Sequence, residues 1–293
     1  MPESKEDYIS GIIVKGISGF WYVDSEKGYF ECRARGSFRN DNIKPLVGDK
    51  VLISADIKSE KGTVEKILPR KNVLLRPPVA NVTQMAVVLA AANPKPNLYL
   101  TDKVLASAKL ADANALICVN KTDIENADEI CAIYKNAGYT VIPMSAKNDE
   151  NIDTLREYLK KNVTVFAGNS GVGKSSILNR ITGLDQFETG EVSKRVERGR
   201  HTTRHSELVK IDDMTYIIDT PGFGNLDMSL LNPENCASLF IEFEQYIGKC
   251  RFLDCNHTVE PGCAVLKALE NGEIEPSRHN SYLKLIEELK NKR

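Results

Sequence analysis

A glycine-rich loop followed by a lysine and a serine is the segment of this sequence best suited to chemistry. Residues 168–175 read GNSGVGKS and match G-x-x-x-x-G-K-[ST], between an expected strand, VTVFA, and an expected helix, SSILNRITG. Backbone N–H groups of such a loop face phosphate oxygens, while Lys174 would neutralise β- and γ-phosphate charge and Ser175 would hold Mg²⁺. The predicted phosphate-binding residues are Gly168, Asn169, Ser170, Gly171, Val172, Gly173, Lys174, Ser175 and Ser176.

A second motif, Asp219-Thr-Pro-Gly222, follows the expected strand MTYII. Its carboxylate would join the water shell of Mg²⁺, and the Gly222 amide would sense the γ-phosphate. Thr202 or Thr203, in GRHTTR between the two motifs, can lend a hydroxyl to the same Mg²⁺. The sequence does not decide between the two threonines.

The group that places the attacking water is less defined. Phe223 follows the second motif, so the glutamine that often orients this water is missing there. His201 is the nearest candidate by sequence, and the alternative is a histidine that only packs or binds phosphate.

The base is predicted from two short strings that follow strands. The aspartate of NKTD can accept hydrogen bonds from N1–H and the exocyclic amine of guanine, and adenine offers neither donor at those positions. The string SAK, downstream of it, fits a loop whose backbone N–H meets guanine O6, although SAK alone is weak. The predicted guanine-binding residues are Asn120, Lys121, Thr122, Asp123, Ser145, Ala146 and Lys147.

Three thiols and one imidazole gather near the C-terminal end, in the pattern C-x4-C-x-H-x5-C. Four such ligands fill a tetrahedral Zn²⁺ site, which would make the metal structural rather than catalytic. The alternative is ordinary cysteines in a helical domain. The predicted ligands are Cys250, Cys255, His257 and Cys263, whereas Cys32, Cys118, Cys131 and Cys236 are expected to be core residues.

The elements that must position these residues change in kind along the chain. Residues 8–69 read as short strands with turns between them, as in an OB-type barrel, and from Asn72 buried strands alternate with helices. The buried runs predict a parallel sheet with its ligand site at the carboxyl ends of the strands. These runs are Met85–Ala91, Ala115–Val119, Val141–Met144, Val163–Ala167 and Tyr216–Ile218, and a final amphipathic helix is expected at Ser281–Lys290.

Two local clusters leave alternatives open. The aromatics of the barrel segment either fill its core, which we favour, or face RNA. A basic stretch before the second motif is either a solvated loop or a surface that faces phosphate or RNA. The first cluster is Trp21, Tyr22, Tyr29 and Phe30, and the second is Lys194, Arg195, Arg198, Arg200 and Arg204, opposed only by Glu197.

Composition bounds the class of protein. With 42% hydrophobic and 27% charged residues among 293, the chain suits two or three compact domains and not a disordered polymer. The net charge of −1 gives no sign of a nucleic-acid partner. The polar start MPESKEDYIS and the longest apolar run, Met85–Ala92, argue against export and membrane insertion, and seven cysteines favour a reducing compartment, for which the cytoplasm fits best.

The order of the motifs is itself informative, because NKTD and SAK precede the phosphate loop and DTPG. In Ras-like proteins the order is reversed, so the predicted GTPase domain is circularly permuted. We therefore expect a multidomain α/β chain. It would comprise an OB-type barrel over residues 1–70, a circularly permuted P-loop GTPase with helices on both faces of its sheet over 71–225, and a helical zinc-binding domain over 226–293.

The chain resembles the ribosome small-subunit-dependent GTPase A family. The features that carry this resemblance are the barrel, RPPVANVTQ, NKTD, SAK, GNSGVGKSS, GRHTT, DTPGF and the cysteine–histidine pattern. The match covers nearly the whole chain without departure at the nucleotide or zinc positions. The resemblance implies that the three domains bind the small ribosomal subunit late in its maturation. It also implies contact with 16S rRNA and stimulation of GTP hydrolysis by the subunit.

The sequence thus predicts hydrolysis of GTP by an in-line water, with Lys174, Mg²⁺ and the loop amides stabilising the developing charge. One rival is an RNA or ribosome scaffold whose pocket binds nucleotide but scarcely turns it over. A small-molecule kinase is a second rival, but it conflicts with NKTD and lacks an obvious acceptor site. A monomer is our default expectation.

Overall fold

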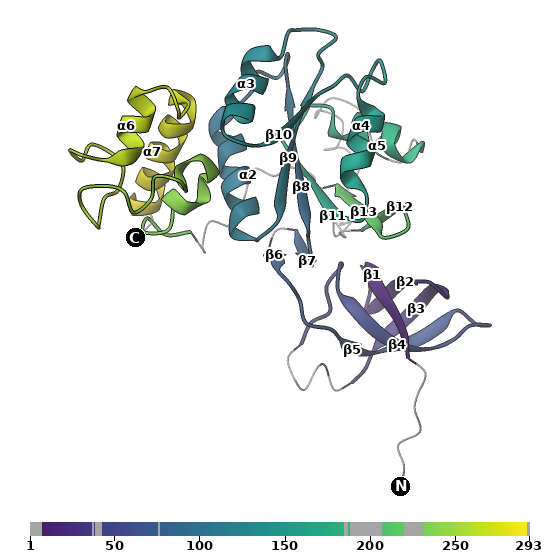
Figure 1. Ribbon diagram of the computed structural model, residues 1–293. Coiled ribbons are helices and arrows are strands. Elements are labelled where there is room, and N and C mark those ends of the chain that lie inside the picture. Colours follow the sequence, from purple (N-terminus) through teal and green to yellow (C-terminus); the bar gives the residue numbers. More distant parts are fainter. Residues whose placement is uncertain are drawn as a thin grey trace. The chain divides into compact units, whose positions relative to one another are not determined.

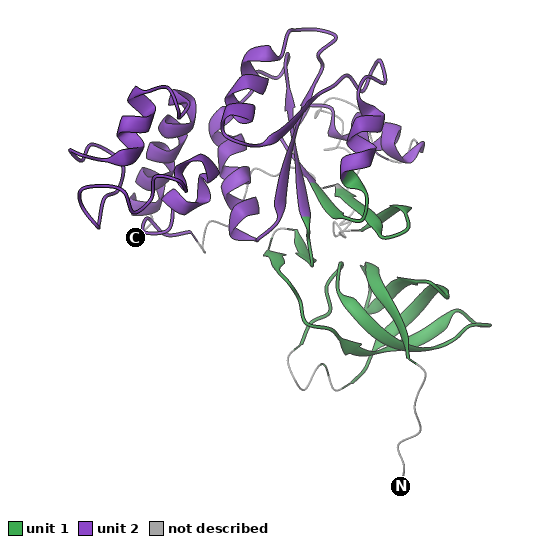
Figure 2. Cartoon of the chain, in the orientation of Figure 1, with its two compact units in different colours: residues 1–83, 159–165, 195–220 green, residues 84–158, 166–194, 221–293 purple. Residues whose placement is uncertain are grey.

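A computed structural model describes residues 8–36, 38, 43–75, 77–184, 187, 207–219 and 231–291, with the Asp219 side chain left out (Figure 1). The predicted residues His201, Thr202, Thr203 and Gly222 and the basic stretch from Lys194 to Arg204 therefore lie outside the described residues. The chain divides into two compact units, coloured in Figure 2. Unit 1 is Met1–Thr83, Leu159–Val165 and Arg195–Thr220, and unit 2 is Gln84–Tyr158, Phe166–Lys194 and Pro221–Arg293.

Five strands of unit 1 close into a barrel in the order β1-β2-β3-β5-β4. Closure leaves no exposed sheet edge, and alternate side chains of the strands point inward to form one core that includes Ile13, Phe30 and Val51. The expected OB-type barrel is confirmed. Its strands are β1 Ile9–Ile17, β2 Phe20–Ser25, β3 Gly28–Ala34, β4 Lys50–Asp56 and β5 Lys61–Ile67.

The aromatic cluster of the barrel divides between its inside and its outside. Phe30 is buried in the core and Trp21 packs against it, as expected. The core interpretation is wrong for the other two, because Tyr29 is 47% exposed and stacks on the half-buried Tyr22, with ring centroids 5.8 Å apart. Strand alternation is the reason, since Tyr22 and Tyr29 each precede a residue that points inward, Val23 and Phe30.

A short hairpin follows the barrel within unit 1. Strands β6 Val73–Leu75 and β7 Pro78–Ala80 pair antiparallel, a feature that the sequence analysis did not predict. Gly48 lies against it with φ +89°, and a Cβ at this position would stand 2.1 Å from the carbonyl oxygen of Ala80. Only glycine allows the two backbones to approach so closely.

The remaining strands form a six-stranded sheet in the order β10-β9-β8-β11-β13-β12. All five buried runs predicted from the sequence are strands of this sheet. The difference lies at its edge, where β12 pairs antiparallel with β13. Because β12 alternates between half-buried and exposed residues, it lacks the continuous apolar run that identified the others. The strands are β8 Gln84–Ala90, β9 Asn114–Asn120, β10 Thr140–Pro143, β11 Val163–Ala167, β12 Val209–Asp212 and β13 Thr215–Asp219.

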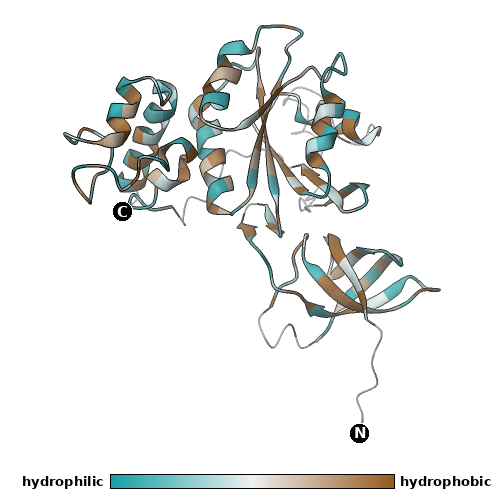
Figure 3. Ribbon diagram, viewed as in Figure 1, coloured by the Kyte–Doolittle hydropathy of each residue, from teal (hydrophilic) through white to brown (hydrophobic). Residues whose placement is uncertain are grey.

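Helices cover both faces of the sheet in unit 2, as expected. Figure 1 shows α2 and α3 on one face and α4 and α5 on the other. Figure 3 shows that these helices carry both hydrophobic and hydrophilic bands, as helices with one buried face do. Their bounds are α2 Leu98–Leu110, α3 Asp128–Asn136, α4 Ile152–Leu159 and α5 Lys174–Thr182.

The last part of unit 2 is helical. Short 3₁₀ turns at Ala237–Leu239 and Ile241–Phe243 are followed by α6 Ala264–Glu270 and α7 Pro276–Asn291, so the final helix begins five residues before the predicted one. Helix α7 lies against α2. Among the described residues, none of the helices has both the length and the apolar content that crossing a membrane requires.

A buried arginine joins these helices. Arg278 of α7 donates from Nη1 to Asp102 Oδ1 of α2 at 2.5 Å and from Nε to Glu242 Oε1 at 2.6 Å, and its guanidinium lies 4.8 Å from the centre of the Phe240 ring. Burial alone would lower the pKa of Arg278, but the two carboxylates raise it above its usual value. The arginine is therefore a fixed charge that needs both partners.

We expect Arg278→Ala to lower the free energy of unfolding by about 3–5 kcal/mol, because it leaves two buried carboxylates without their cation. Urea unfolding of the full chain measures the change. The exposed Lys290→Ala in the same helix is the matched control and should stay within about 0.5 kcal/mol of the parent protein. A loss below about 1 kcal/mol for Arg278→Ala would contradict a structural role for the network.

Candidate functional site

The phosphate loop lies between β11 and α5, where the carboxyl end of a strand meets the start of a helix. Its glycines fit places that a side chain would fill. A Cβ on Gly168 would stand 2.3 Å from the carbonyl oxygen of Val88, and a Cβ on Gly173, whose φ is +95°, would stand 2.2 Å from Asn120 Nδ2. The loop can therefore curl tightly against β8 and β9 only with glycine at both positions.

Asn120 ties three loops together at the end of β9. Its Nδ2 donates to the carbonyl oxygen of Val172 in the phosphate loop at 2.9 Å, and its Oδ1 accepts from the Ala146 N–H at 3.0 Å. The side chain is buried, so both bonds are shielded from water. One amide thus sets the spacing between the phosphate loop, the NKTD segment and the SAK loop.

Two lysines bind the backbone of the phosphate loop. Lys121 Nζ donates to the carbonyl oxygens of Gly171, at 2.8 Å, and Asn93. Lys174 Nζ donates to the carbonyl oxygens of Gly168 and Asn169 at 2.8 and 2.9 Å. Lys121 therefore braces the outside of the loop, whereas the Lys174 ammonium lies within its curl.

Asp123 is held in place from two sides. Its Oδ1 accepts from Ser145 Oγ at 2.7 Å, and Lys147 Nζ lies 3.7 Å from Oδ2. The carboxylate is 8% exposed and has acceptor capacity beyond these two contacts. Its neighbour Thr122 is bonded elsewhere, to Glu150 Oε2 at 3.1 Å.

An open cleft of about 760 Å³ brings the predicted base and phosphate residues together in unit 2. This volume lies within the range of small-molecule sites. Most of the lining belongs to the predicted segments, but five residues were not predicted: Ile124, Asp149, Asn179, Arg180 and Gly183. The full lining is Asn120, Lys121, Asp123, Ile124, Ala146, Lys147, Asp149, Gly173, Ser176, Asn179, Arg180 and Gly183.

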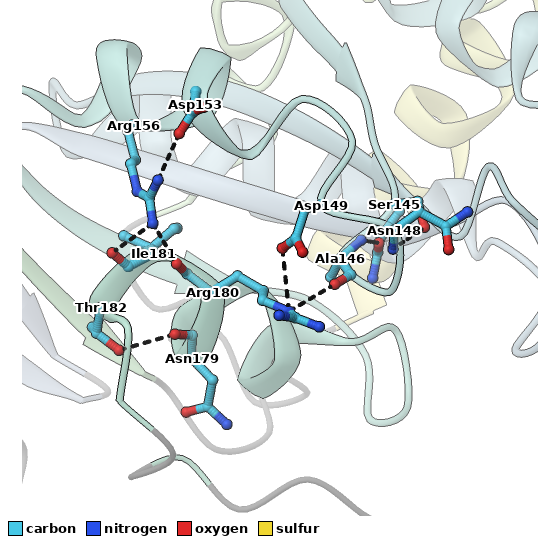
Figure 4. Close-up of polar contacts among 11 residues, drawn as sticks. Ser145, Ala146, Asn148, Asp149, Asp153, Arg156, Asn179, Arg180, Ile181 and Thr182 are labelled. Carbon is cyan, nitrogen blue, oxygen red and sulfur yellow. Dashed lines mark hydrogen bonds and ion pairs between the residues drawn. The ribbon is translucent and has the colours of Figure 1, made fainter.

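Figure 4 shows how Arg180 of α5 reaches the SAK loop. Its Nε donates to the carbonyl oxygen of Ala146 at 3.2 Å and lies 3.3 Å from Asp149 Oδ1. From α4, Arg156 Nη2 donates to the carbonyl oxygen of Arg180 at 2.5 Å. No motif contains Arg180, yet helical spacing could have identified it, because residues three, four and seven after Ser176 share its helix face.

The residues predicted to hold Mg²⁺ are only partly described. Ser175 lies half-buried in the first turn of α5, and Asp219 is the last residue of β13. The threonines, His201 and Gly222 fall outside the described residues. Their predicted roles therefore remain predictions.

The predicted metal ligands converge in the C-terminal region. The ligand atoms of Cys250, Cys255, His257 and Cys263 all lie within 4.8 Å of one another. His257 Nδ1 is 3.5 Å from Cys250 Sγ and 3.4 Å from Cys263 Sγ, and the two sulfurs are 3.9 Å apart. Tetrahedral ligands at zinc bond lengths would be separated by about 3.6 Å for N–S and about 3.8 Å for S–S pairs. The cluster is therefore a candidate structural metal site.

The surroundings of the cluster suit ligation. The N–H groups of Ala264 and Leu266 approach the sulfurs of Cys250 and Cys263 at 3.3 and 3.4 Å, as partners of a thiolate do. Burial lowers the pKa of His257, which favours the neutral imidazole that binds metal. Burial also raises the pKa of Cys255 to about 12, so without a cation this thiol keeps its proton.

Two family models match the chain. The model of the RsgA GTPase matches residues 67–229, and the model of the RsgA N-terminal domain matches residues 10–64. Among curated proteins, the small ribosomal subunit biogenesis GTPase RsgA of Clostridium botulinum strain Hall is 44% identical over 290 residues, covering 97% of this chain and 99% of the relative. The protein of the same name from Clostridium perfringens is 43% identical over 288 residues, with the same coverage.

Two solved structures share the fold over nearly their whole length. YjeQ from Thermotoga maritima has a TM-score of 0.83 and 36% identity, covering 98% of this chain and 100% of its own. YloQ, described as a circularly permuted GTPase, has a TM-score of 0.82 and 32% identity, covering 100% of this chain and 99% of its own. The permuted order inferred from the motifs is confirmed.

We expect the purified chain to carry one equivalent of metal and Cys263→Ser to lose most of it, because three ligands cannot complete a closed tetrahedral site. Elemental analysis of the desalted protein measures the content. Asp254→Asn, an exposed change in the same loop, is the control and should keep the metal. A full equivalent retained in Cys263→Ser would remove this cysteine from the ligand set.

Proposed function

Since the chain belongs to the RsgA GTPase family, and is thereby a GTP hydrolase, we propose that it converts GTP to GDP and phosphate during late maturation of the small ribosomal subunit. The observation that carries the nucleotide part is the bonding of Asn120 to both the phosphate loop and the SAK loop. Through it, the residues that would read the base and those that would hold the phosphates share one cleft.

Guanine is the base that the cleft suits. Asp123, held by Ser145, would accept from N1–H and the exocyclic amine. The Ala146 N–H already donates to Asn120, so the amide we assign to O6 is that of Lys147, which donates to no acceptor among the described residues. Adenine would present no donor to the Asp123 carboxylate, which is the basis for its rejection.

The phosphates would lie in the curl from Gly168 to Ser176. Loop N–H groups and Lys174 would stabilise the charge that develops on the γ-phosphate as an in-line water attacks. Mg²⁺, when bound with GTP, supplies further positive charge at the β- and γ-phosphates. We assign its binding to Ser175, to Thr202 or Thr203, and, through water, to Asp219. Gly222 would sense the γ-phosphate, and His201 would orient the water.

Turnover of the isolated chain should be slow. Neither a glutamine after DTPG nor an arginine finger is identified in the sequence, so we expect intrinsic rates on the order of 10⁻⁴ to 10⁻² per second. A partner that places His201 beside the attacking water would raise this rate. Stimulation by a partner is therefore part of the proposal.

The partner we propose is the small ribosomal subunit with its 16S rRNA. Support comes from the names of the two clostridial relatives, small ribosomal subunit biogenesis GTPases that cover 97% of this chain. We propose a division of labour among an OB barrel over 1–70, a GTPase domain over 71–225 and a zinc-binding domain over 226–293. Zn²⁺ fits the ligand set Cys250, Cys255, His257 and Cys263 best, because tetrahedral sites of three thiolates and one imidazole select it. We further propose a monomer in the cytoplasm.

The alternative is a nucleotide-sensing RNA or ribosome scaffold with negligible turnover. The presence of Lys174, Ser175 and Asp219 together argues against a pocket that has lost its chemistry.

We expect small subunits to raise kcat for GTP at least tenfold at one fixed salt concentration, while large subunits leave it within about twofold. Phosphate release by the purified chain alone and with each subunit measures this. Lys174→Ala, which removes the phosphate-binding ammonium, should abolish both the basal and the stimulated rate and serves as the control. Equal rates with and without small subunits would refute the proposed partner and leave the GTPase assignment intact.

A further inference from the structure

The β12–β13 hairpin is fastened to the outside of the barrel within unit 1. Lys15 of β1 forms an isolated antiparallel bridge with Glu207, and their side chains make an ion pair of 2.7 Å. Next to it, the N–H of Leu208 donates to the carbonyl oxygen of Val14 at 2.8 Å. Glu207 and Leu208 immediately precede β12, so the hairpin is held to β1 where it begins.

The contact uses a stretch of β1 that β4 does not cover. The antiparallel pairing of β1 with β4 ends at Ile12, opposite Lys50, so Val14 and Lys15 have no register partner on β4. The pairing of β1 with β2 shifts between Ile13, opposite Val23, and Lys15, opposite Tyr22, so Val14 between them has no partner on β2. Such a bulge changes the direction of the backbone groups, and here the Val14 carbonyl oxygen accepts from the Leu208 N–H and not from β2.

A single carboxylate holds the hairpin at a second point. Asp24 Oδ2 of β2 accepts from the Tyr216 hydroxyl at 2.6 Å and from Lys210 Nζ at 2.9 Å. Lys210 and Tyr216 are cross-strand partners, so Asp24 grips both strands of the hairpin. Burial, and then the bond to Asp24, raises the pKa of Tyr216 and keeps its hydroxyl protonated as a donor.

The start of β13 is also fixed to the segment before β11, which belongs to the same unit. The N–H of Tyr216 donates to the carbonyl oxygen of Asn162 at 2.9 Å, and the Lys161 N–H donates to Thr215 Oγ1 at 2.9 Å. The hairpin is thus held from the barrel side and from the sheet side before the chain reaches Asp219.

The contacts between the barrel and the hairpin contribute little to the stability of the fold. The barrel has its own complete core, and the Lys15–Glu207 and Lys210–Asp24 pairs are partly exposed, so each contributes little to folding. Their place in the chain is more telling. Tyr216 stands three residues before Asp219, and Glu207 stands four residues after Thr203, so the grip lies between the motifs assigned to Mg²⁺.

We propose that Asp24 of the barrel is a positioning residue for the nucleotide reaction, because it holds the hairpin whose second strand, β13, ends at Asp219. This inference rests on the proposed role of Asp219. The barrel would thereby influence the Mg²⁺ requirement. A ligand that shifts β1 or β2 changes the position of the hairpin, and the Mg²⁺ concentration needed for tight binding changes with it.

The test measures binding without turnover. A fluorescent, non-hydrolysable GTP analogue is titrated with Mg²⁺, and the concentration giving half of the Mg²⁺-dependent gain in affinity is compared between proteins. Asp24→Asn and Tyr216→Phe should raise this concentration at least fivefold, while affinity for the analogue in EDTA stays within twofold of the parent. Tyr216→Phe removes one hydroxyl and keeps the ring, so it remains informative if Asp24→Asn folds poorly.

Asp213→Asn is the matched control. Asp213 lies in the turn of the same hairpin, is fully exposed, and stands 3.9 Å from the same Lys210; among the described residues it forms no ion pair or hydrogen bond with the barrel. It should behave as the parent protein. Half-saturating Mg²⁺ within twofold of the parent in both Asp24→Asn and Tyr216→Phe would overturn the inference.

A second arm separates this inference from the proposed partner. Stimulation of kcat by small subunits is measured for the same proteins. If the parent protein is not stimulated, the proposed partner fails, but the Mg²⁺ titration still decides the role of Asp24. If the parent is stimulated, Asp24→Asn and Tyr216→Phe should lose at least half of the stimulation and Asp213→Asn none of it. Full stimulation in both Asp24→Asn and Tyr216→Phe would refute an influence of the barrel on turnover.

Discussion

The amide of Asn120 is the constraint on which the nucleotide cleft depends. It donates to the phosphate loop and accepts from the SAK loop while its own backbone ends β9, so three separate chain segments have one fixed spacing. The bond forms only because Gly173 has no Cβ, which would otherwise stand 2.2 Å from Nδ2. Lys121, which donates to Gly171, and Arg180, which donates to Ala146, brace the same loops from either side. Contacts between protein groups thereby fix the spacing of the cleft, and such preorganisation favours binding.

This constraint also explains why the permuted chain order does no harm. The loops meet because their strands end at one edge of a sheet, and sheet order, not chain order, decides which ends are neighbours. What the permutation changes is which segments of the chain precede and follow the strand that ends at Asp219. The strand that ends at Asp219 is part of a hairpin bonded to the barrel, and it is followed in sequence by the helical region with the candidate metal site, in which Arg278 bonds to Asp102 of α2. Both flanking parts are thus attached to elements beside the catalytic motifs.

Much of this could be predicted because the chemistry needs fixed spacing. Residue types and spacing alone predicted the sites of three motifs, GNSGVGKS, NKTD and the cysteine–histidine pattern. Continuous apolar runs identified five strands of the sheet. The failures share a physical cause, namely that partners distant in the chain decide the outcome. Tyr22 and Tyr29 read as core until strand alternation placed them outside, and β12 had no apolar run because it pairs at an edge. Arg278 is charged, and only Asp102 and Glu242, more than thirty residues away in the chain, explain its burial.

The central claim is that Asp123 in this cleft reads guanine, and the nucleotide preference of Asp123→Asn tests it most directly. Xanthine carries a carbonyl where guanine has its amine, so an asparagine amide can donate where the aspartate accepted. Competitive binding of GTP and xanthosine triphosphate should show the parent favouring GTP and the variant favouring the xanthine nucleotide, with a combined change of about 100-fold or more. A variant that binds both nucleotides as the parent does would mean that another group reads the base, and the account of the cleft would be wrong.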